Sequence, residues 1–216
     1  PPLCVFDAKR SSVSADMSKT ERGGRGVSPR TTNFYLYPMF TRINLDENYY
    51  LGLPRPGDEK TYVQWLNEKE IFDRTLTIPF PYTEADGVWY IDHCREETAR
   101  MGKPVNWVLR RKPDNILVGG GGFHNFNLFK PHVGEIGYWL AKPYWGKGIM
   151  TGMVAALCRY GHEELGLIRL EAPIFAFNIA SQRVLEKNGF QEEGYLRKAY
   201  LKEGRYIDGK LFARIF

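Results

Sequence analysis

Glycines interrupt the segment WLAKPYWGKGIMTGM, where an apolar, strand-like stretch gives way to a helix-like one. Gly146 and Gly148 flank Lys147 at the start of that helix, and Thr151 adds a hydroxyl in its first turn. The first N–H groups of a helix lack intrahelical partners and carry partial positive charge. Glycine also lets a phosphate approach the backbone without a Cβ in the way. The turn therefore predicts a pyrophosphate site, with an ordinary glycine-rich turn as the alternative.

Two phosphate-binding fingerprints are not matched at this turn. The nucleotide-hydrolase pattern GxxxxGK[ST] is absent, and Gly146, Gly148 and Gly152 give GxGxxxG instead of the dinucleotide pattern GxGxxG. Glu171 does follow about 20 residues later, where a ribose-binding acid would stand. An oxidoreductase therefore stays as an alternative, although the chain offers one such βαβ unit and no substrate domain before it.

A second motif, FNIASQRVLEKNGF at 177–190, follows the next strand-like stretch. In order along the chain, GEIGYWLAKPYWGKGIMT (134–151), NIASQRVLEKNGF (178–190) and EGRYIDGKLFARI (203–215) resemble the GNAT superfamily of acetyl-CoA-dependent N-acetyltransferases. The branch with the ribosomal-protein N-terminal alanine acetyltransferases is the most similar, and the earlier segment EKEIFDRTLTIPFPYTEADGVWYI looks similar too. The resemblance covers about residues 42–216.

The resemblance implies a mixed sheet that splays between its fourth and fifth strands, with acetyl-CoA in the gap. Because pantetheine carries amides that can pair like a strand, an open strand edge suits it. Asn178 would contact the pantetheine side, and Ser181 would lie near the thioester. The other implied cofactor contacts are the backbone of Trp139, Leu140 and Ala141 along the pantetheine arm, and of Trp145, Gly146, Lys147, Gly148, Ile149, Met150 and Thr151 around the pyrophosphate.

Two positions depart from the family pattern. Gly152 stands where the branch usually has Glu, which weakens the helix by about 1 kcal/mol on propensity and touches no expected contact. Leu185 stands where many members carry a tyrosine acid, four residues before the glycine that follows the last helix. Another group must then protonate the leaving thiolate.

The implied reaction is direct attack of a neutral amine on the thioester. An α-amino group has a pKa of about 7.7–8.0 and a lysine amine about 10.4, so an α-amine needs the weaker base. Glu135 is the preferred base, with a solvent-facing strand glutamate as the alternative. His124 is a rival base or a packed histidine. Ser181 is the candidate proton donor, or a simple cofactor contact.

Other side chains are candidates for the acceptor pocket. Asp208 would orient the acceptor amine or pair across the sheet, and the run Gly119–Gly122 permits a bulge, the close approach of a ligand or a flexible edge. No spacing of His, Cys and Asp indicates a metal site. Aromatic residues are expected to line the pocket, with core packing as the alternative: Phe80, Tyr82, Trp89, Phe123 and Tyr138.

Several functions remain open at this point. The leading one is acetyl transfer to an amine, with a protein N-terminus as one acceptor. A non-catalytic acyl-CoA-binding module is a different class: Leu185 favours it mildly, whereas Glu135, Asn178 and Ser181 argue against it. A polyamine, amino acid or amino-sugar is the alternative acceptor, favoured if a set of acidic residues faced the cleft, namely Glu84, Asp86, Asp92, Glu96 and Glu97.

The hydrophobic pattern predicts a frame for these residues in the order β, α, α, β, β, β, α, β, α, β, β. This is a mixed α/β sheet of seven strands with helices on both faces, in a single GNAT-like domain. Thr83 resembles a helix N-cap, and Asn188-Gly189 a helix stop. The expected strands are 48–53, 106–111, 116–125, 134–141, 167–175, 193–201 and 205–215, and the expected helices are 58–66, 84–100, 146–166 and 180–187.

Composition sets the outer limits. The 216 residues are 43% hydrophobic and 25% charged, as in globular proteins. A Ser/Gly-rich arm at 1–33 holds most of the net charge of +5, and a domain at 34–216 follows, so no nucleic-acid partner is expected. No membrane span is expected. Three widely spaced cysteines, Cys4, Cys94 and Cys158, fit a reducing, cytoplasmic compartment. A monomer or homodimer is expected.

Overall fold

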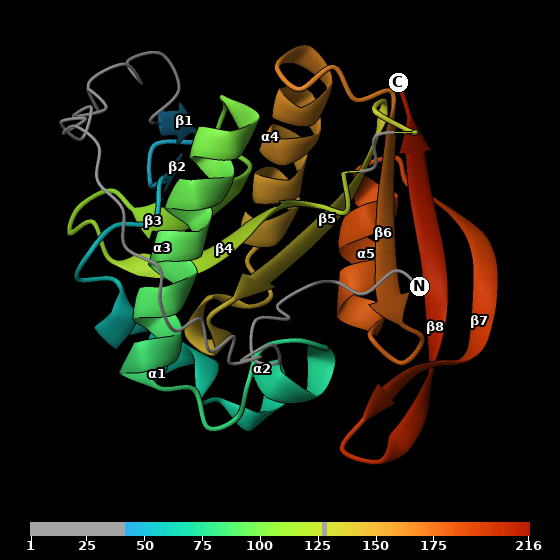
Figure 1. The fold of residues 1–216 in the computed structure, drawn as a ribbon, viewed down its shortest axis with the longest axis horizontal. Coiled ribbons are helices and arrows are strands. Elements are labelled where there is room, and N and C mark those ends of the chain that lie inside the picture. Colours follow the sequence, from blue (N-terminus) through green and yellow to red (C-terminus); the bar gives the residue numbers. More distant parts are fainter. Residues whose placement is uncertain (1–41, 127–128) are drawn as a thin grey trace, which may run out of the picture.

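The computed structural model describes residues 42–126 and 129–216. In this part of the chain, strands form one mixed sheet in the order β1-β2-β3-β4-β5-β6-β8-β7 (Figure 1). The strands are β1 (Arg42–Asn44), β2 (Tyr49–Gly52), β3 (Asn106–Arg111), β4 (Leu117–His124), β5 (Val133–Leu140), β6 (Arg169–Phe175), β7 (Gln191–Lys202) and β8 (Arg205–Ile215). The α-helices are α1 (Glu59–Leu66), α2 (Lys69–Arg74), α3 (Glu84–Met101), α4 (Ile149–Glu163) and α5 (Ile179–Lys187).

The expected α/β class is confirmed, and the sheet has eight strands where seven were expected. β1 is three residues long and pairs antiparallel with β2, with Ile43 opposite Leu51. Its largely exposed residues give no hydrophobic pattern to detect. The six-residue helix α2 was missed for a related reason, because it is too short to show a helical period. The expected arm at 1–33 and the expected domain start at 34 lie outside the described residues.

Local signals fix the helix ends. The Thr83 side chain accepts the Asp86 N–H, and Asp86 accepts the Thr83 N–H in return, which confirms the predicted N-cap of α3. α4 begins at Ile149, later than expected, because Gly148 has a left-handed φ of +75° and stands outside the helix. α5 ends as expected, with Gly189 at a φ of +77°.

Helices cover both faces of the sheet, as expected (Figure 1). One face packs against α4 and α5 through buried residues such as Leu157 and Leu185. The other packs against α1 and α3 through buried residues such as Tyr62 and Ile91. The sheet is therefore the middle layer, and any ligand that enters between two of its strands is enclosed by helices on both sides.

The glycine run 119–122 lies in β4, which runs between β3 and β5, so the flexible-edge alternative is excluded. A Cβ on Gly121 would lie 2.6 Å from the Gly137 carbonyl oxygen, and one on Gly122 would lie 2.4 Å from the Val105 carbonyl oxygen. Neighbouring backbone occupies the space that side chains would need. Close approach of the neighbouring strands therefore accounts for glycine at these two positions.

The sheet splays between β5 and β6, the fourth and fifth of the expected strands. The two strands pair in parallel only from Val133 opposite Arg169 to Glu135 opposite Glu171. Beyond that point β5 pairs with β4 and β6 pairs with β8, so the ribbons diverge (Figure 1). The expected splay is confirmed.

Pro173 lies at this divergence, on β6. Ala176 donates its N–H to the Asp208 carbonyl on β8. The backbone groups of Ala176 therefore point towards β8. Because these directions alternate along a strand, the backbone of Pro173 points to the opposite side, towards β5. Proline has no N–H to donate there. The chain therefore lacks a ladder donor at the place where the two strands separate.

Candidate active site

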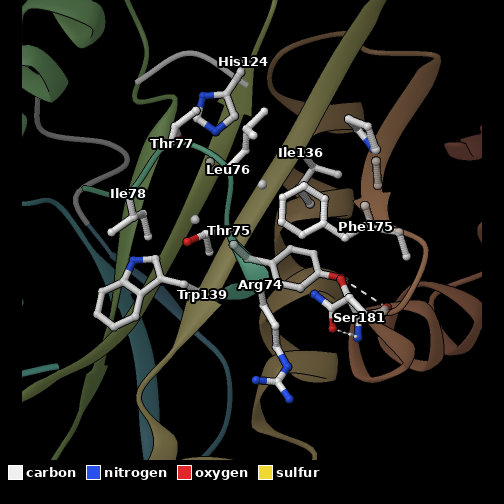
Figure 2. Close-up of a pocket in the computed structure, with 18 of the residues that line it drawn as sticks. Arg74, Thr75, Leu76, Thr77, Ile78, His124, Ile136, Trp139, Phe175 and Ser181 are labelled. Atoms are coloured by element: carbon white, nitrogen blue, oxygen red, sulfur yellow. Dashed lines mark hydrogen bonds between the residues drawn. The ribbon is translucent and has the colours of Figure 1, made fainter. Parts of the chain in front are cut away.

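A cleft opens where β5 and β6 separate (Figure 2). β5 contributes residues 136–139 to its wall, and β6 contributes residues 172–175. The rest of the wall comes from α1, the end of α2 and the segment after it, α3, β4, the start of α5 and β7, with Tyr62, Leu66, 74–78, Tyr82, Tyr90, Gly121, Gly122, His124, Asn178, Ser181 and Tyr200. Both halves of the splayed sheet therefore build one site.

No aspartate or glutamate is among the described residues that line the cleft. The acidic residues of α3 are engaged on the helix surface: Asp86 in the capping box, Asp92 with Arg95 and Glu97 with Arg100. The remaining two, Glu84 and Glu96, are exposed and do not line the cleft. A cationic small molecule such as a polyamine would have been favoured if these acidic residues faced the cleft, and they do not.

The β5 edge that faces the gap carries the backbone groups of alternate residues. Ala141 donates its N–H to β4 at 2.8 Å, and the Trp139 carbonyl oxygen lies 2.7 Å from where a β4 glycine would carry a Cβ. Both residues therefore direct their backbone groups towards β4. Tyr138 and Leu140 face the gap, because these directions alternate. The Leu140 carbonyl already accepts the Trp145 Nε1–H at 2.7 Å.

The glycine turn stands at the end of this edge. Gly146 and Gly148 are exposed, with φ of +74° and +75°, and a Cβ on either would meet nothing within 4 Å. α4 begins at Ile149 with no side chain capping its N-terminus. The backbone N–H groups of Ile149, Met150 and Thr151 are therefore without intrahelical partners. This arrangement fits an anion held by backbone.

Side chains around the turn are oriented by the loop. Lys147 donates from Nζ to the Pro143 carbonyl at 3.0 Å, so its ammonium group is engaged with the loop itself. Arg74 lines the cleft, and its Cζ lies 5.3 Å from the centroid of the Trp145 ring. The sequence pattern does not single out Arg74, because the last residue of a six-residue helix carries no periodic signal.

Tyr138 and Ser181 meet across the gap. The two hydroxyl oxygens lie 2.7 Å apart, and burial raises the pKa of Tyr138 far above its usual value. Ser181 donates its backbone N–H to Asn178 Oδ1 at 3.2 Å, so the Asn178 side chain caps α5 while it lines the cleft. Leu185 is fully buried in the core, so this position supplies no proton.

The two candidate bases, His124 and Glu135, stand opposite each other in the β4–β5 ladder. His124 lines the cleft, and burial lowers its pKa to about 4, so the imidazole is neutral near pH 7. Glu135 is 6% exposed and accepts the Asn125 Nδ2–H at 2.8 Å. It is not among the described residues that line the cleft. The structure therefore places the rival base in the cleft, and it excludes the solvent-facing alternative for Glu135.

Of the expected acceptor-pocket aromatics, Tyr82 and Tyr138 line the cleft. Phe123 is buried in the core, which is the packing alternative. Trp89 stacks on an imidazole of its own helix α3, and Phe80 packs against α2; neither is among the described lining residues.

Asp208 holds the β7–β8 hairpin together. It accepts the Tyr195 hydroxyl and the Lys198 backbone N–H, each at 2.7 Å. Lys198 stands at a β7 irregularity with a φ of +51°, and the two donors, Lys198 first, lower the pKa of Asp208. Asp208 is not among the described lining residues, and its contacts match the cross-pairing alternative.

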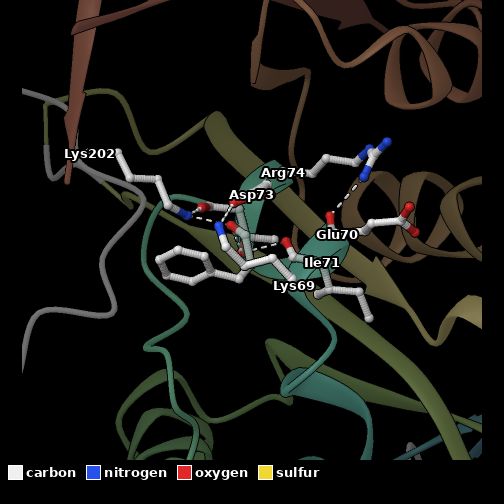
Figure 3. A network of polar contacts seen from close by, with 8 residues as sticks. Lys69, Glu70, Ile71, Asp73, Arg74 and Lys202 are labelled. Carbon is white, nitrogen blue, oxygen red and sulfur yellow. Dashed lines mark hydrogen bonds and ion pairs between the residues drawn. The ribbon is translucent and has the colours of Figure 1, made fainter. Parts of the chain in front are cut away.

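Lys202 connects β7 to the end of α2 (Figure 3). Its Nζ donates to the carbonyls of Phe72 and Thr75 and lies 3.6 Å from the centroid of the Phe72 ring. A cation is favoured beside the carbonyls that end a helix. This contact holds β7, which carries Tyr200, against the segment after α2, and residues of both segments line the cleft.

Other chemistries find no support in the described part of the chain. Burial raises the pKa of Cys94 to about 12 and that of Cys158 to about 11, so neither thiol is a ready nucleophile. Within residues 42–126 and 129–216, no group of three or more His, Cys, Asp or Glu could hold a metal ion. None of the helices in those ranges is long and apolar enough to cross a membrane.

Residues 50–191 match the family described as "Acetyltransferase (GNAT) domain". The chain belongs to the GNAT acetyltransferase family. The resemblance seen in the sequence motifs is thereby confirmed, together with the fold that it implied.

Several relatives of this GNAT chain are known. The uncharacterized N-acetyltransferase YoaA of Bacillus subtilis (strain 168) is 34% identical over 109 residues, which are 50% of this chain and 61% of YoaA. The first curated relatives are matched over 43–61% of their own length. An acetyltransferase structure from Bacillus anthracis superposes with a TM-score of 0.67 at 25% identity, covering 81% of this chain and 98% of that one.

A ribosomal enzyme shares the fold. The structure of RimL, a ribosomal L7/L12 α-N-protein acetyltransferase in complex with coenzyme A, superposes with a TM-score of 0.71 at 22% identity. The match covers 81% of this chain and 98% of that one. At this identity the match shows the common fold.

Gly148→Ala should weaken acetyl-CoA binding, because a Cβ would stand at the helix start where the pyrophosphate is expected. Gly166→Ala is the matched control: Gly166 has a φ of +69°, has nothing within 4 Å of an added Cβ, and follows the far end of α4. Both variants carry the same backbone strain, about 1–2 kcal/mol. Calorimetric titration with acetyl-CoA should show at least tenfold weaker binding for Gly148→Ala alone. Equal affinities would contradict a backbone-held pyrophosphate.

His124 should make the fold sensitive to acid. Its pKa is about 4 in the folded chain and about 6.5 in an unfolded one. Between these values the unfolded state binds more protons, so the free energy of unfolding falls as the pH drops through this window. In urea unfolding at about pH 7 and about pH 5, His124→Asn should lose less stability than the parent. His132→Asn, at an exposed position, serves as the control, and an equal loss in all three proteins would contradict the buried neutral imidazole.

Proposed function

We propose that this GNAT protein transfers an acetyl group from acetyl-CoA to a primary amine by direct attack in a ternary complex, and that the acceptor is the α-amine of a polypeptide. One observation carries the proposal: the open β5 edge leads to an uncapped glycine helix start and borders a cleft whose described lining residues include no carboxylate. The edge and the turn suit the cofactor, and the cleft suits the acceptor amine.

The cofactor would be held mainly by backbone. Tyr138 and Leu140 present their N–H groups to the gap, where the amide carbonyls of pantetheine would accept them. The N–H groups of the first turn of α4 would hold the pyrophosphate. The guanidinium of Arg74 would add positive charge beside this turn, because it lies against Trp145. Asn178 uses Oδ1 to cap α5 and would donate from Nδ2.

The cleft favours an amine that is already partly neutral. Desolvation penalises a charged amine, and no carboxylate of the described lining would stabilise its ammonium form. The neutral imidazole of His124 would accept a hydrogen bond from the attacking N–H. An α-amine has a pKa of about 7.7–8.0, whereas a lysine amine, at about 10.4, would lose its proton at greater cost.

The rate would come from positioning two bound reactants and from small proton movements. His124 would orient the amine, and Glu135 remains a candidate proton relay because it stands opposite His124 in the ladder. Ser181 would donate to the leaving sulfur. Acetyl-CoA supplies the activated acyl group, so the chain has no covalent intermediate to form.

Two further observations support a polypeptide acceptor inside the cell. The RimL structure, with the same fold, is named as a protein α-N-acetyltransferase. The free, buried thiols of Cys94 and Cys158 suit the reducing cytoplasm. The expectation of a monomer or homodimer, without a nucleic-acid partner, remains part of the proposal.

Release of free thiol from acetyl-CoA should depend on a free N-terminus. The panel consists of a lysine-free peptide with a free N-terminus, a peptide with a blocked N-terminus and one lysine, and spermidine. We expect turnover above background with the first acceptor only, and a rate that rises with pH through the α-amine pKa of about 8.

Three outcomes would contradict the proposal. Faster turnover with spermidine would assign a small-molecule amine as the acceptor. Tight acetyl-CoA binding without turnover on any amine would favour an acyl-CoA-binding module. Thermal stabilisation by NAD, and none by acetyl-CoA, would restore the oxidoreductase alternative.

A further inference from the structure

The hydroxyl pair Tyr138–Ser181 joins the two halves of the splayed sheet. Tyr138 projects from β5, and Ser181 stands in the first turn of α5, which follows β6. Their hydroxyl oxygens lie 2.7 Å apart, and both residues line the cleft. The pair therefore stands where the pantetheine arm is expected to run.

The 2.7 Å contact between the two hydroxyl groups allows either oxygen to be the donor. Each hydroxyl has one proton to donate, and burial keeps Tyr138 protonated by raising its pKa. The Tyr138 hydroxyl can donate to Ser181 Oγ at 2.7 Å or to the Ser181 carbonyl at 3.4 Å. The shorter bond is the stronger one. When Tyr138 donates to Oγ, the Ser181 proton is left to donate into the cleft.

We propose that Tyr138 is a positioning residue that fixes the Ser181 hydroxyl as the donor to the sulfur that leaves the thioester. This inference rests on the proposed function. The amine nitrogen forms a bond to the carbonyl carbon, the C–S bond breaks, and its electron pair stays on sulfur. The nitrogen loses its proton to water. The Ser181 O–H stabilises the thiolate by a charge-assisted hydrogen bond until coenzyme A leaves.

The pair also supplies a hydroxyl donor in a chain that has Leu185 where many family members carry a tyrosine acid. That side chain is fully buried, on the face of α5 that packs into the core. The tyrosine hydroxyl reaches the cleft from a strand that lies 43 residues earlier than Ser181. Sequence reasoning grouped Tyr138 with the acceptor aromatics, because nothing in the sequence shows that β5 and α5 meet.

The test compares Tyr138→Phe, Ser181→Ala and the double variant with the parent in steady-state coenzyme A release. We expect each single variant to lower kcat about 10- to 100-fold, as for loss of a hydrogen bond to a charged group, with KM for acetyl-CoA within about twofold. The double variant should be no slower than Ser181→Ala, because Tyr138 acts through Ser181. Tyr160→Phe is the control: it removes a buried hydroxyl that bonds to the Pro104 carbonyl in the core, and kcat should stay unchanged.

Two results would overturn the inference on their own. These are an unchanged kcat in Tyr138→Phe, or effects of the two single changes that multiply in the double variant. A parent protein that binds acetyl-CoA but acetylates no amine would overturn the proposed function, and this inference with it. Thermal unfolding of each variant separates a loss of folding from a loss of kcat.

Discussion

The loss of pairing between β5 and β6 is the constraint on which the site depends. Backbone groups away from water need partners, and a strand edge that opens inside a sheet leaves several without one. Two features of the chain reduce the number of unpaired backbone groups at the gap. Pro173 removes one N–H donor on β6, and the Trp145 side chain donates to the Leu140 carbonyl on β5. The backbone N–H groups that remain unpaired on β5 face the cleft. A ligand with its own amides can therefore bind there in place of the missing strand.

The splay persists because the two half-sheets are joined elsewhere. On the core side, α4 and α5 pack together, and Asn188 ties the end of α5 to α4 through the Thr151 carbonyl at 3.2 Å. On the far side, Lys202 attaches β7 to the end of α2. These contacts join the two half-sheets at positions outside the β5–β6 gap. They hold the two half-sheets in place on either side of the gap, where β5 and β6 are not paired.

The glycine turn and the helix ends could be predicted from the sequence, because their signals are local, whereas the expected backbone contacts of Trp139 and Ala141 with pantetheine meet β4 instead. A left-handed glycine, an N-cap and a strand-to-helix transition each occupy a few consecutive residues, as at Gly148 and Thr83. The two missed elements, β1 and α2, are three and six residues long and show no period. Arg74 was missed with α2, because only the folded chain brings it to Trp145.

The candidate catalytic groups were harder to rank, because their proposed roles depend on burial and on partners from other strands. Glu135 and His124 are neighbours in the ladder, yet the cleft includes only His124. The direction of backbone groups along β5 was also beyond the sequence. It turns Leu140 towards the gap and Ala141 towards β4, a distinction that depends on the register with β4.

We propose that acetyl-CoA occupies the gap and is held by backbone from β5 and from the first turn of α4. Residue-resolved amide NMR of the full chain, with and without acetyl-CoA, tests it most directly. We expect shifts and slower hydrogen exchange at Tyr138, Leu140 and residues 149–151, while the Ala141 amide, already bonded to β4, keeps its protection. Saturating acetyl-CoA that leaves these five amides unchanged and perturbs another surface would contradict this binding mode.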